Sequence, residues 1–142
     1  MAITSAICNS FKQEILVGTH NLTASSGDTF KLALFTSSAT FGASTTAYST
    51  SNEVSGTGYT AGGATLTSVT PVLDGSTAVC DFSDVSFTSA SFTANGCLIY
   101  NSSQSDKAVA VIAFGGDKTV SSGTFTIQFP TADASNAIIR IA

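Results

Sequence analysis

The spacing of hydrophobic residues changes once along the chain and separates a helical start from a β-rich remainder. Between residues 5 and 17, apolar side chains recur at every fourth position: Ile7, Phe11 and Ile15. This spacing places them on one face of a helix. Thr4 or Ser5 carries a hydroxyl suited to the helix N-cap, and Gly18 is suited to its C-terminal end. We expect an amphipathic helix within residues 1–20, packed on its own domain or on a neighbouring subunit.

After this segment the hydrophobic period becomes two, which is typical of strands. Thr29–Phe35 alternates Phe30, Leu32 and Leu34 with Lys31 and Ala33, and this predicts a half-buried strand. Asp74-Gly75 is a hairpin-type turn signal. Shorter extended segments are expected over the following ranges: 64–69, 70–73, 77–82, 84–87, 91–93 and 136–141.

Two apolar runs, Gly96–Tyr100 and Ala108–Phe114, predict central strands covered on both faces. Asn101–Lys107 between them reads as a polar loop, Gly115-Gly116-Asp117 as a turn, and Thr124–Phe129 as an alternating strand. About eight short strands with regular turn signals are typical of a β-sandwich. We therefore predict a mainly β fold: residues 1–142 form one antiparallel β-sandwich or jelly-roll-like domain with one N-terminal α-helix.

The segment from residue 37 to residue 63 does not fit the strand pattern. It holds a single charge, Glu53, yet it carries Phe41, Tyr48, Val54 and Tyr59, which a disordered linker rarely needs. Loops of this length in a compact domain are usually functional or mobile. We predict an extended arm or Ω-type loop that becomes ordered on a partner surface. The alternative is an exposed loop with one short irregular strand.

Composition adds that the polar surface is mostly uncharged. Ser and Thr supply 43 of the 142 residues, and charged residues make up 10%, against about 25% in an average soluble domain. Such a surface favours protein contacts, although Thr also follows strand propensity. The net charge is −4 and the five cations are scattered, which argues against a nucleic-acid partner because phosphates require a basic patch.

Cysteine usage and the length of the apolar runs indicate the cellular compartment in which the chain folds. Cys8, Cys80 and Cys97 form no motif, so reduced, buried thiols are expected, with a Cys80–Cys97 bridge as the alternative. The first residues lack the features of a signal peptide, and Ala108–Phe114 is too short to span a bilayer. We expect assembly in a reducing cytoplasm and no membrane partner.

Residues able to do chemistry are few. Gly56–Ala61 fits a dinucleotide-binding pattern superficially, but no strand–turn–helix unit surrounds it. His20 is the only histidine, has no nucleophile motif near it, and is expected to interact with the last carbonyls of the helix. The scattered acids read as solvated loop residues rather than Ca²⁺ ligands: Asp81, Asp84, Asp106 and Asp117. We predict no catalytic residue, no cofactor and no metal site.

Several stretches, taken together, resemble a group of small virion proteins of tailed bacteriophages. They are NSFKQEILVGTHNL (residues 9–22), FKLALFTSSATFGASTTAYSTSNEVSGTGYTAGGATL (30–66), FTANGCLIYNSS (92–103) and KAVAVIAFGGDKTVSSGTFTIQFP (107–130). The resemblance covers most of the chain, and its motifs are structural rather than catalytic. It implies a small β protein present in many copies on a phage particle.

These observations lead to one expected function and two alternatives. The first is a capsid decoration or cement protein, located on the virion surface as a trimer and bound to the major capsid protein. The alternatives are a tail, neck or fibre component that contacts a receptor, and a virion-associated hydrolase. The expected partner contacts come from the helix and from the 37–63 segment: Phe11, Ile15, Phe41, Tyr48, Val54 and Tyr59.

Overall fold

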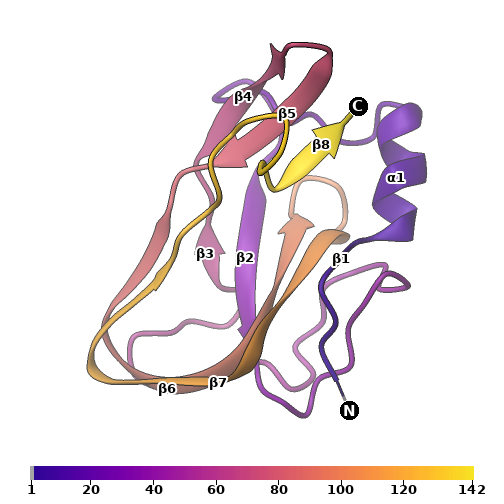
Figure 1. Cartoon of the computed structure of the whole chain (residues 1–142). Helices are drawn as coiled ribbons and strands as arrows, with labels where there is room; N and C mark the ends of the chain where they lie inside the picture. Colours follow the sequence, from indigo (N-terminus) through magenta and orange to yellow (C-terminus); the bar gives the residue numbers. More distant parts are fainter. Residues whose placement is uncertain (1) are drawn as a thin grey trace.

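Eight strands and one short helix form the fold in the computed structural model, which describes residues 2–142 (Figure 1). In chain order they are β1 (Ala6–Ile7), α1 (Asn9–Leu16), β2 (Phe30–Phe35), β3 (Ala64–Thr65), β4 (Ser68–Asp74), β5 (Thr77–Phe82), β6 (Val85–Asn101), β7 (Lys107–Ile127) and β8 (Ile139–Ile141). They build two antiparallel sheets, β1–β7–β6–β2–β3 and β4–β5–β8. The predicted fold class, a mainly β sandwich of about eight strands with one helix near the N-terminus, is confirmed.

Apolar side chains of both sheets meet in one buried cluster. Phe30 of β2 and Leu98 of β6 are fully buried in the large sheet, and Phe82 of β5 and Ile139 of β8 are buried in the small one. The rings of Phe30 and Phe82 lie 5.8 Å apart, so they connect the two sheets directly. The sheets therefore share a core, and neither buries its apolar face alone.

Strand β2 differs from the half-buried strand that its alternation predicts. Ala33 and Leu34 point to opposite faces of the sheet, yet both are fully buried. The strand lies between β6 and β3, and both of its faces are covered. The prediction of central strands at Gly96–Tyr100 and Ala108–Phe114 is correct, although each is only part of a longer strand.

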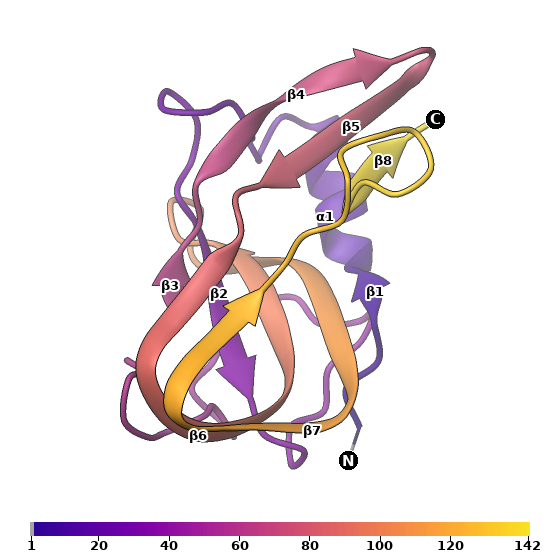
Figure 2. The ribbon, with the colours of Figure 1, turned by 60° about the vertical axis from the view of Figure 1, so that its left-hand side comes forward.

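Strands β6 and β7 replace several of the predicted short strands. They pair from Val85–Ile127 to Asn101–Lys107 and curve together around the base of the molecule (Figure 2). The turn predicted at Gly115-Gly116-Asp117 is instead a bulge within β7. Between the pairs Ala94–Lys118 and Gly96–Ala113, residues 114–117 of β7 face one residue of β6. Positive φ angles at both glycines, +76° and +144°, accommodate the extra residues without breaking the pairing.

The hairpin predicted at Asp74-Gly75 is present. It joins β4 to β5, and Gly75 has a φ of +62°, which suits glycine at a tight turn. The tip of this hairpin projects beyond the rest of the molecule (Figures 1 and 2). Most of β4 is exposed, so the hairpin presents side chains to solvent.

The helix is shorter than its hydrophobic spacing predicts. Ala6–Ile7 pair with β7 as strand β1, which leaves only Asn9–Leu16 for α1. Cys8 occupies the N-cap without a side-chain hydrogen bond, so the expected cap from Thr4 or Ser5 is wrong. The predicted end is correct, because Gly18 follows the helix with a φ of +78°.

All three cysteines are buried and unpaired. Cys80 lies on β5 of the small sheet and Cys97 on β6 of the large sheet, and the two form no bridge. Burial raises the pKa of both thiols to about 12 and that of Cys8 to about 11. These thiols behave as small apolar core groups rather than as nucleophiles.

Candidate functional site

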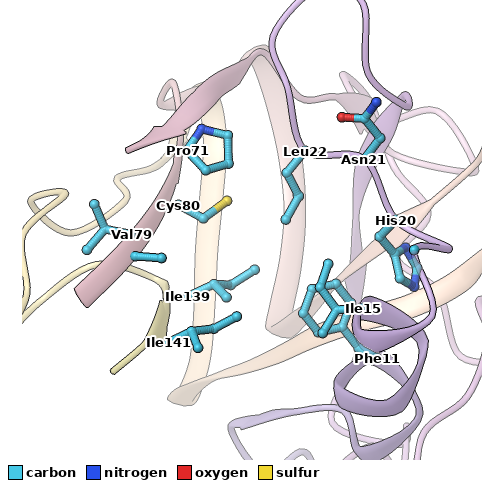
Figure 3. A pocket seen from close by; sticks show the side chains of 12 residues that line it. Phe11, Ile15, His20, Asn21, Leu22, Pro71, Val79, Cys80, Ile139 and Ile141 are labelled. Carbon is cyan, nitrogen blue, oxygen red and sulfur yellow. The ribbon is translucent and has the colours of Figure 1, made fainter. Parts of the chain in front are cut away.

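A groove of about 420 Å³ opens between α1 and the inner face of the small sheet (Figure 3). Its walls come from α1, from the segment after the helix, and from all three strands of the small sheet. The lining is largely apolar: Phe11, Ile15, Gly18, His20, Asn21, Leu22, Pro71, Ala78, Val79, Cys80, Ile139 and Ile141. Grooves of this shape and composition are the usual sites of ligand or protein docking.

Local periodicity explains why these side chains face each other. Phe11 and Ile15 are four residues apart, so they lie on the same face of α1. Ile139 and Ile141 alternate on β8 and pair with Cys80 and Ala78 of β5, which places all four on one face of the small sheet. In Figure 3 the isoleucines of β8 point across the groove toward Phe11 and Ile15.

Exposed apolar side chains are concentrated at one end of the molecule. Among residues 2–142, every strongly exposed large hydrophobic side chain lies at or directly after the C-terminal end of α1 or on the small sheet: Leu16 (85% exposed), Val17 (67%), Val69 (42%), Val72 (59%), Leu73 (73%) and Ile141 (57%). Single exposed apolar residues are ordinary, but a concentration on the elements that also form a groove marks an interaction surface. We call this region, α1 together with the β4–β5–β8 sheet, the apolar end.

Two cations lie on the apolar end. A second hollow of about 310 Å³ continues from the groove between α1 and β8, and Lys12 and Arg140 line it. Both side chains are exposed and donate hydrogen bonds to neutral oxygens, Lys12 to Asn9 Oδ1 at 3.4 Å and Arg140 to the Ala134 carbonyl at 3.1 Å. Arg140 also interacts electrostatically with the Asp133 carboxylate of its own chain, so among the described residues Lys12 is the cation of this pair without a nearby acidic partner at the hollow.

A buried polar cluster fixes the wall of the groove that follows α1. Asn101 donates from Nδ2 to His20 Nδ1 (2.9 Å) and to Asp28 Oδ2 (2.8 Å). Because His20 Nδ1 accepts, the ring carries its proton on Nε2 and donates it to Glu14 Oε1 at 3.0 Å. Burial opposes ionisation of Asp28, but hydrogen bonds from Asn101, Asn21 and Gln104 lower the pKa of its carboxyl below the usual value.

The hydrogen-bond partner predicted for His20 is therefore wrong. The ring contacts the Glu14 carboxylate and Asn101 rather than the last helix carbonyls, because it turns inward against Phe11 at a ring distance of 4.8 Å. Both ring nitrogens are engaged, and neither of their partners is a serine or cysteine. A nucleophile–histidine pair is not assembled at this position.

The 37–63 segment forms a second region of interest, and its organisation corrects the predicted arm. Glu53 lies at its centre and accepts three hydrogen bonds: from Tyr48 Oη (2.7 Å), Tyr59 Oη (2.6 Å) and the Gly62 amide (2.7 Å). Tyr59 also accepts from the Leu34 amide of β2, and Tyr48 stacks on Tyr100 of β6 at 4.5 Å. The segment is thus bound to its own large sheet.

Burial around Glu53 changes the acidity of the two tyrosines. Desolvation is the largest cause that raises the pKa of both phenols, followed by their hydrogen bonds to the Glu53 carboxylate. Both hydroxyls therefore remain protonated donors over the ordinary pH range. The cluster is internally satisfied, and its geometry serves to hold the loop.

The residues predicted to contact a partner separate into three groups. Val54 is 4% exposed, so its side chain belongs to the core, and the prediction of a surface role for it is corrected. Phe11 is only 2% exposed, yet it lines the groove beside Ile15. Phe41, Tyr48 and Tyr59 are partly buried against their own domain. Ile15 lines the groove. The sequence did not single out the other groove residues, although the alternation at Ile139 and Ile141 was a usable signal.

Comparison with known proteins identifies no relative: the chain matches no protein-family model, no curated protein and no solved structure. Among residues 2–142, no helix has the length and apolar character needed to cross a membrane. Over the same range, no three His, Cys, Asp or Glu side chains are grouped in a way that could hold a metal ion.

Proposed function

We propose that this chain is a structural protein of a tailed-phage particle, most specifically a capsid decoration protein that binds the major capsid protein on the outer lattice. The proposal combines the sequence resemblance to small phage virion proteins with a binding surface of the kind that assembly requires. In this proposal the chain is not an enzyme and uses no cofactor.

The apolar end is the observation that carries the proposal. It carries six exposed hydrophobic side chains and a groove that the chain itself leaves unfilled; Ile141 is both exposed and part of the groove lining. Burial of apolar surface contributes about 25 cal/mol per Å², so another protein subunit that covers this end gains stability from contact alone. A protein that functions by assembly needs such a surface, whereas a hydrolase needs a nucleophile and base at a cleft.

The second contact that decoration requires, with the capsid lattice, suits the charge-poor surface of the long β6–β7 ribbon. Hydroxyl pairs connect its two strands, Thr93 with Thr119 at 2.8 Å and Ser86 with Thr126 at 3.0 Å. Neutral hydroxyls lose less hydration free energy on burial than charged groups do. A wide interface on this ribbon thus avoids uncompensated buried charge.

Binding only to the assembled shell would stabilise that shell by mass action. The test is therefore made on particles that lack this protein. Decoration predicts that such particles lose capsid integrity on heating at a lower temperature than complete particles, while their tails remain normal. Adding back the purified protein should restore the original temperature. Particles that are equally heat-stable but fail to adsorb to cells would overturn the capsid assignment.

Copy number separates the proposed capsid role from a tail, neck or fibre role. A decoration protein follows the capsid lattice and is present in hundreds of copies per particle, whereas a tail or neck component is present in far fewer. Quantitative mass spectrometry of purified particles, normalised to the major capsid protein, measures this ratio. A low ratio would contradict decoration.

A further inference from the structure

We infer that the groove of the apolar end receives the β4–β5 hairpin tip of a second copy of this chain, in a head-to-tail contact. The tip consists of residues 72–75. This inference rests on the proposed function, since it names the subunit that covers the apolar end, and it accounts for four features of the structure.

The first feature is an exposed apolar tip. Leu73 is 73% exposed and Val72 is 59% exposed, at the end of a hairpin that projects from the molecule (Figure 2). Backbone pairing continues to Asp74–Thr77, and a glycine turn closes the hairpin, so the tip is held in one conformation. A rigid apolar projection loses little conformational entropy when it docks.

The second feature is a recess of suitable size. A cavity of roughly 150 Å³ lined by Leu, Ile and Phe is large enough for a benzene molecule. The groove measures about 420 Å³ and has a largely apolar lining. It therefore has room for the side chain of Leu73, whereas Val72, the preceding residue of β4, points to the opposite face of the hairpin.

The third feature is charge complementarity. Asp74 follows Leu73 directly and carries a negative charge at the tip, while Lys12 and Arg140 line the hollow that continues from the groove. Within its own chain, Oδ2 of Asp74 accepts a hydrogen bond from the Ala134 amide at 2.7 Å. Lys12 lies where an incoming Asp74 would be neutralised, and Arg140, which interacts with Asp133 of its own chain, lines the same hollow.

The fourth feature is that a chain cannot fill its own groove in this way. The tip extends from the same sheet that forms one wall of the groove, and β4 and β5 pair from Ser68–Phe82 to Asp74–Thr77 with one irregularity between Val69 and Val72. A second copy is therefore required. Because the two surfaces are different, the contact is heterologous; its repetition gives a ring where the rotation between successive copies closes, and an open filament where it does not. The trimer expected from the sequence is one such ring.

The experiment measures the mass of the purified protein in solution by sedimentation and light scattering. Wild type should form a closed oligomer. Leu73→Asp replaces the apolar side chain at the hairpin tip with a charge, and Ile141→Asp does the same in the lining of the groove. Both positions are exposed enough to tolerate the change. Each variant should weaken association by at least about tenfold. Thr124→Asp, an exposed position on the β6–β7 ribbon, is the matched control and should leave the oligomer unchanged.

Mixing the two variants gives the sharper result. Leu73→Asp retains an intact groove and Ile141→Asp an intact tip, so an equimolar mixture should contain a dimer that neither variant forms alone. Charge exchange provides a second arm: Asp74→Lys should weaken the oligomer, and adding Lys12→Glu and Arg140→Glu should restore it. Melting temperatures of all variants establish that each is folded.

Three outcomes would overturn the inference. They are a wild-type chain that remains monomeric up to about 1 mM, a Leu73→Asp oligomer as stable as wild type, and a variant mixture without dimer. If association fails while the particle experiment still shows capsid stabilisation, the groove receives a different protein and the proposed function stands. If association succeeds but the particles are unaffected, the chain self-assembles without decorating a capsid.

Discussion

The 37–63 segment and the apolar end differ in a way that their sequences do not suggest. The segment looked like a free arm because it is long, polar and aromatic, yet Glu53 and its tyrosines bind it to the large sheet. The apolar end is built from ordinary helix and strand residues, yet its side chains at Leu16 and Leu73 are left in solvent. Whether a region can bind a partner depends on which of its side chains the fold leaves exposed and without contacts.

The same distinction can be stated energetically. A hydrogen-bonded cluster such as that of Glu53 gains nothing from a partner, since each polar group already has one. An exposed apolar groove, in contrast, is stabilised when an apolar surface of another molecule covers it. Four substitutions test whether the two regions differ in this way, and they are ordered by their expected effect on the free energy of unfolding.

Glu53→Ala should have the largest effect. It leaves the hydroxyls of Tyr48 and Tyr59 and the Gly62 amide without an acceptor, and we expect a loss of about 3 kcal/mol in the free energy of unfolding. Glu53→Gln should cost less because its amide oxygen still accepts. Urea denaturation measures both. Asp117→Ala, at an exposed carboxylate, is the control. Equal stability of Glu53→Ala and wild type would show that the loop is held by packing alone.

Tyr59→Phe should have the next largest effect, a loss of about 1–2 kcal/mol, because the Leu34 amide and Glu53 both lose a hydrogen bond. It should also change the response to alkali. The pKa of Tyr59 is raised in the folded chain, mainly by burial, so an unfolded tyrosine ionises first as pH rises above about 10. Stability is therefore lost with rising pH.

The variant should lose stability less steeply between about pH 10 and pH 12. The slope should not vanish, since the pKa of Tyr48 is raised as well. Circular dichroism melts across this pH range make the comparison. Identical slopes for wild type and Tyr59→Phe would mean that Tyr59 ionises equally in both states, which contradicts its burial.

Asp28→Asn tests the polar cluster beside the groove, and we expect a smaller loss of about 1 kcal/mol at neutral pH. Hydrogen bonds hold the pKa of Asp28 below its usual value, so its contribution is present above about pH 4 and is lost as pH falls further. Below that pH the variant and wild type should converge in stability. Acid denaturation followed by intrinsic fluorescence measures this, and a constant difference down to the lowest pH would contradict it.

Leu16→Ser should have the smallest effect on folding. Its side chain is 85% exposed, so the free energy of unfolding should change by less than about 0.5 kcal/mol. Leu32→Ser makes the same chemical change at a fully buried site of β2 and should be severely destabilising. If Leu16→Ser destabilises the chain as Leu32→Ser does, the apolar end is part of the folding core rather than a binding surface.

The fold was predictable where a structural feature is both signalled and caused by residues within one short stretch of the chain. Asp74-Gly75 formed the expected hairpin, Gly18 ended the helix, and the apolar runs around Leu98 and Val109 became central strands. Prediction failed where pairing between distant segments decided the outcome. Gly115-Gly116 has the composition of a turn, but the long pairing of β6 with β7 absorbs it as a bulge.

The candidate site was less predictable than the fold. Phe11 and Ile15 were correctly placed on one helical face, but the spacing could not show that both would line a groove while Phe11 is almost fully covered. The opposite wall comes from Cys80, Ile139 and Ile141, more than sixty residues away in the chain, and the register between β5 and β8 brings them into place.

The sequence by itself determined the fold class, the amphipathic helix, the hairpin turn and the charge-poor surface, because each follows from periodicity, turn chemistry or composition within a short stretch. Only the tertiary structure decided which surface is free. Glu53 turned the 37–63 segment inward, and the packing of α1 against β7 left a groove open between the helix and the small sheet. Exposure depends on the sum of all contacts, and most contacts join residues far apart in sequence.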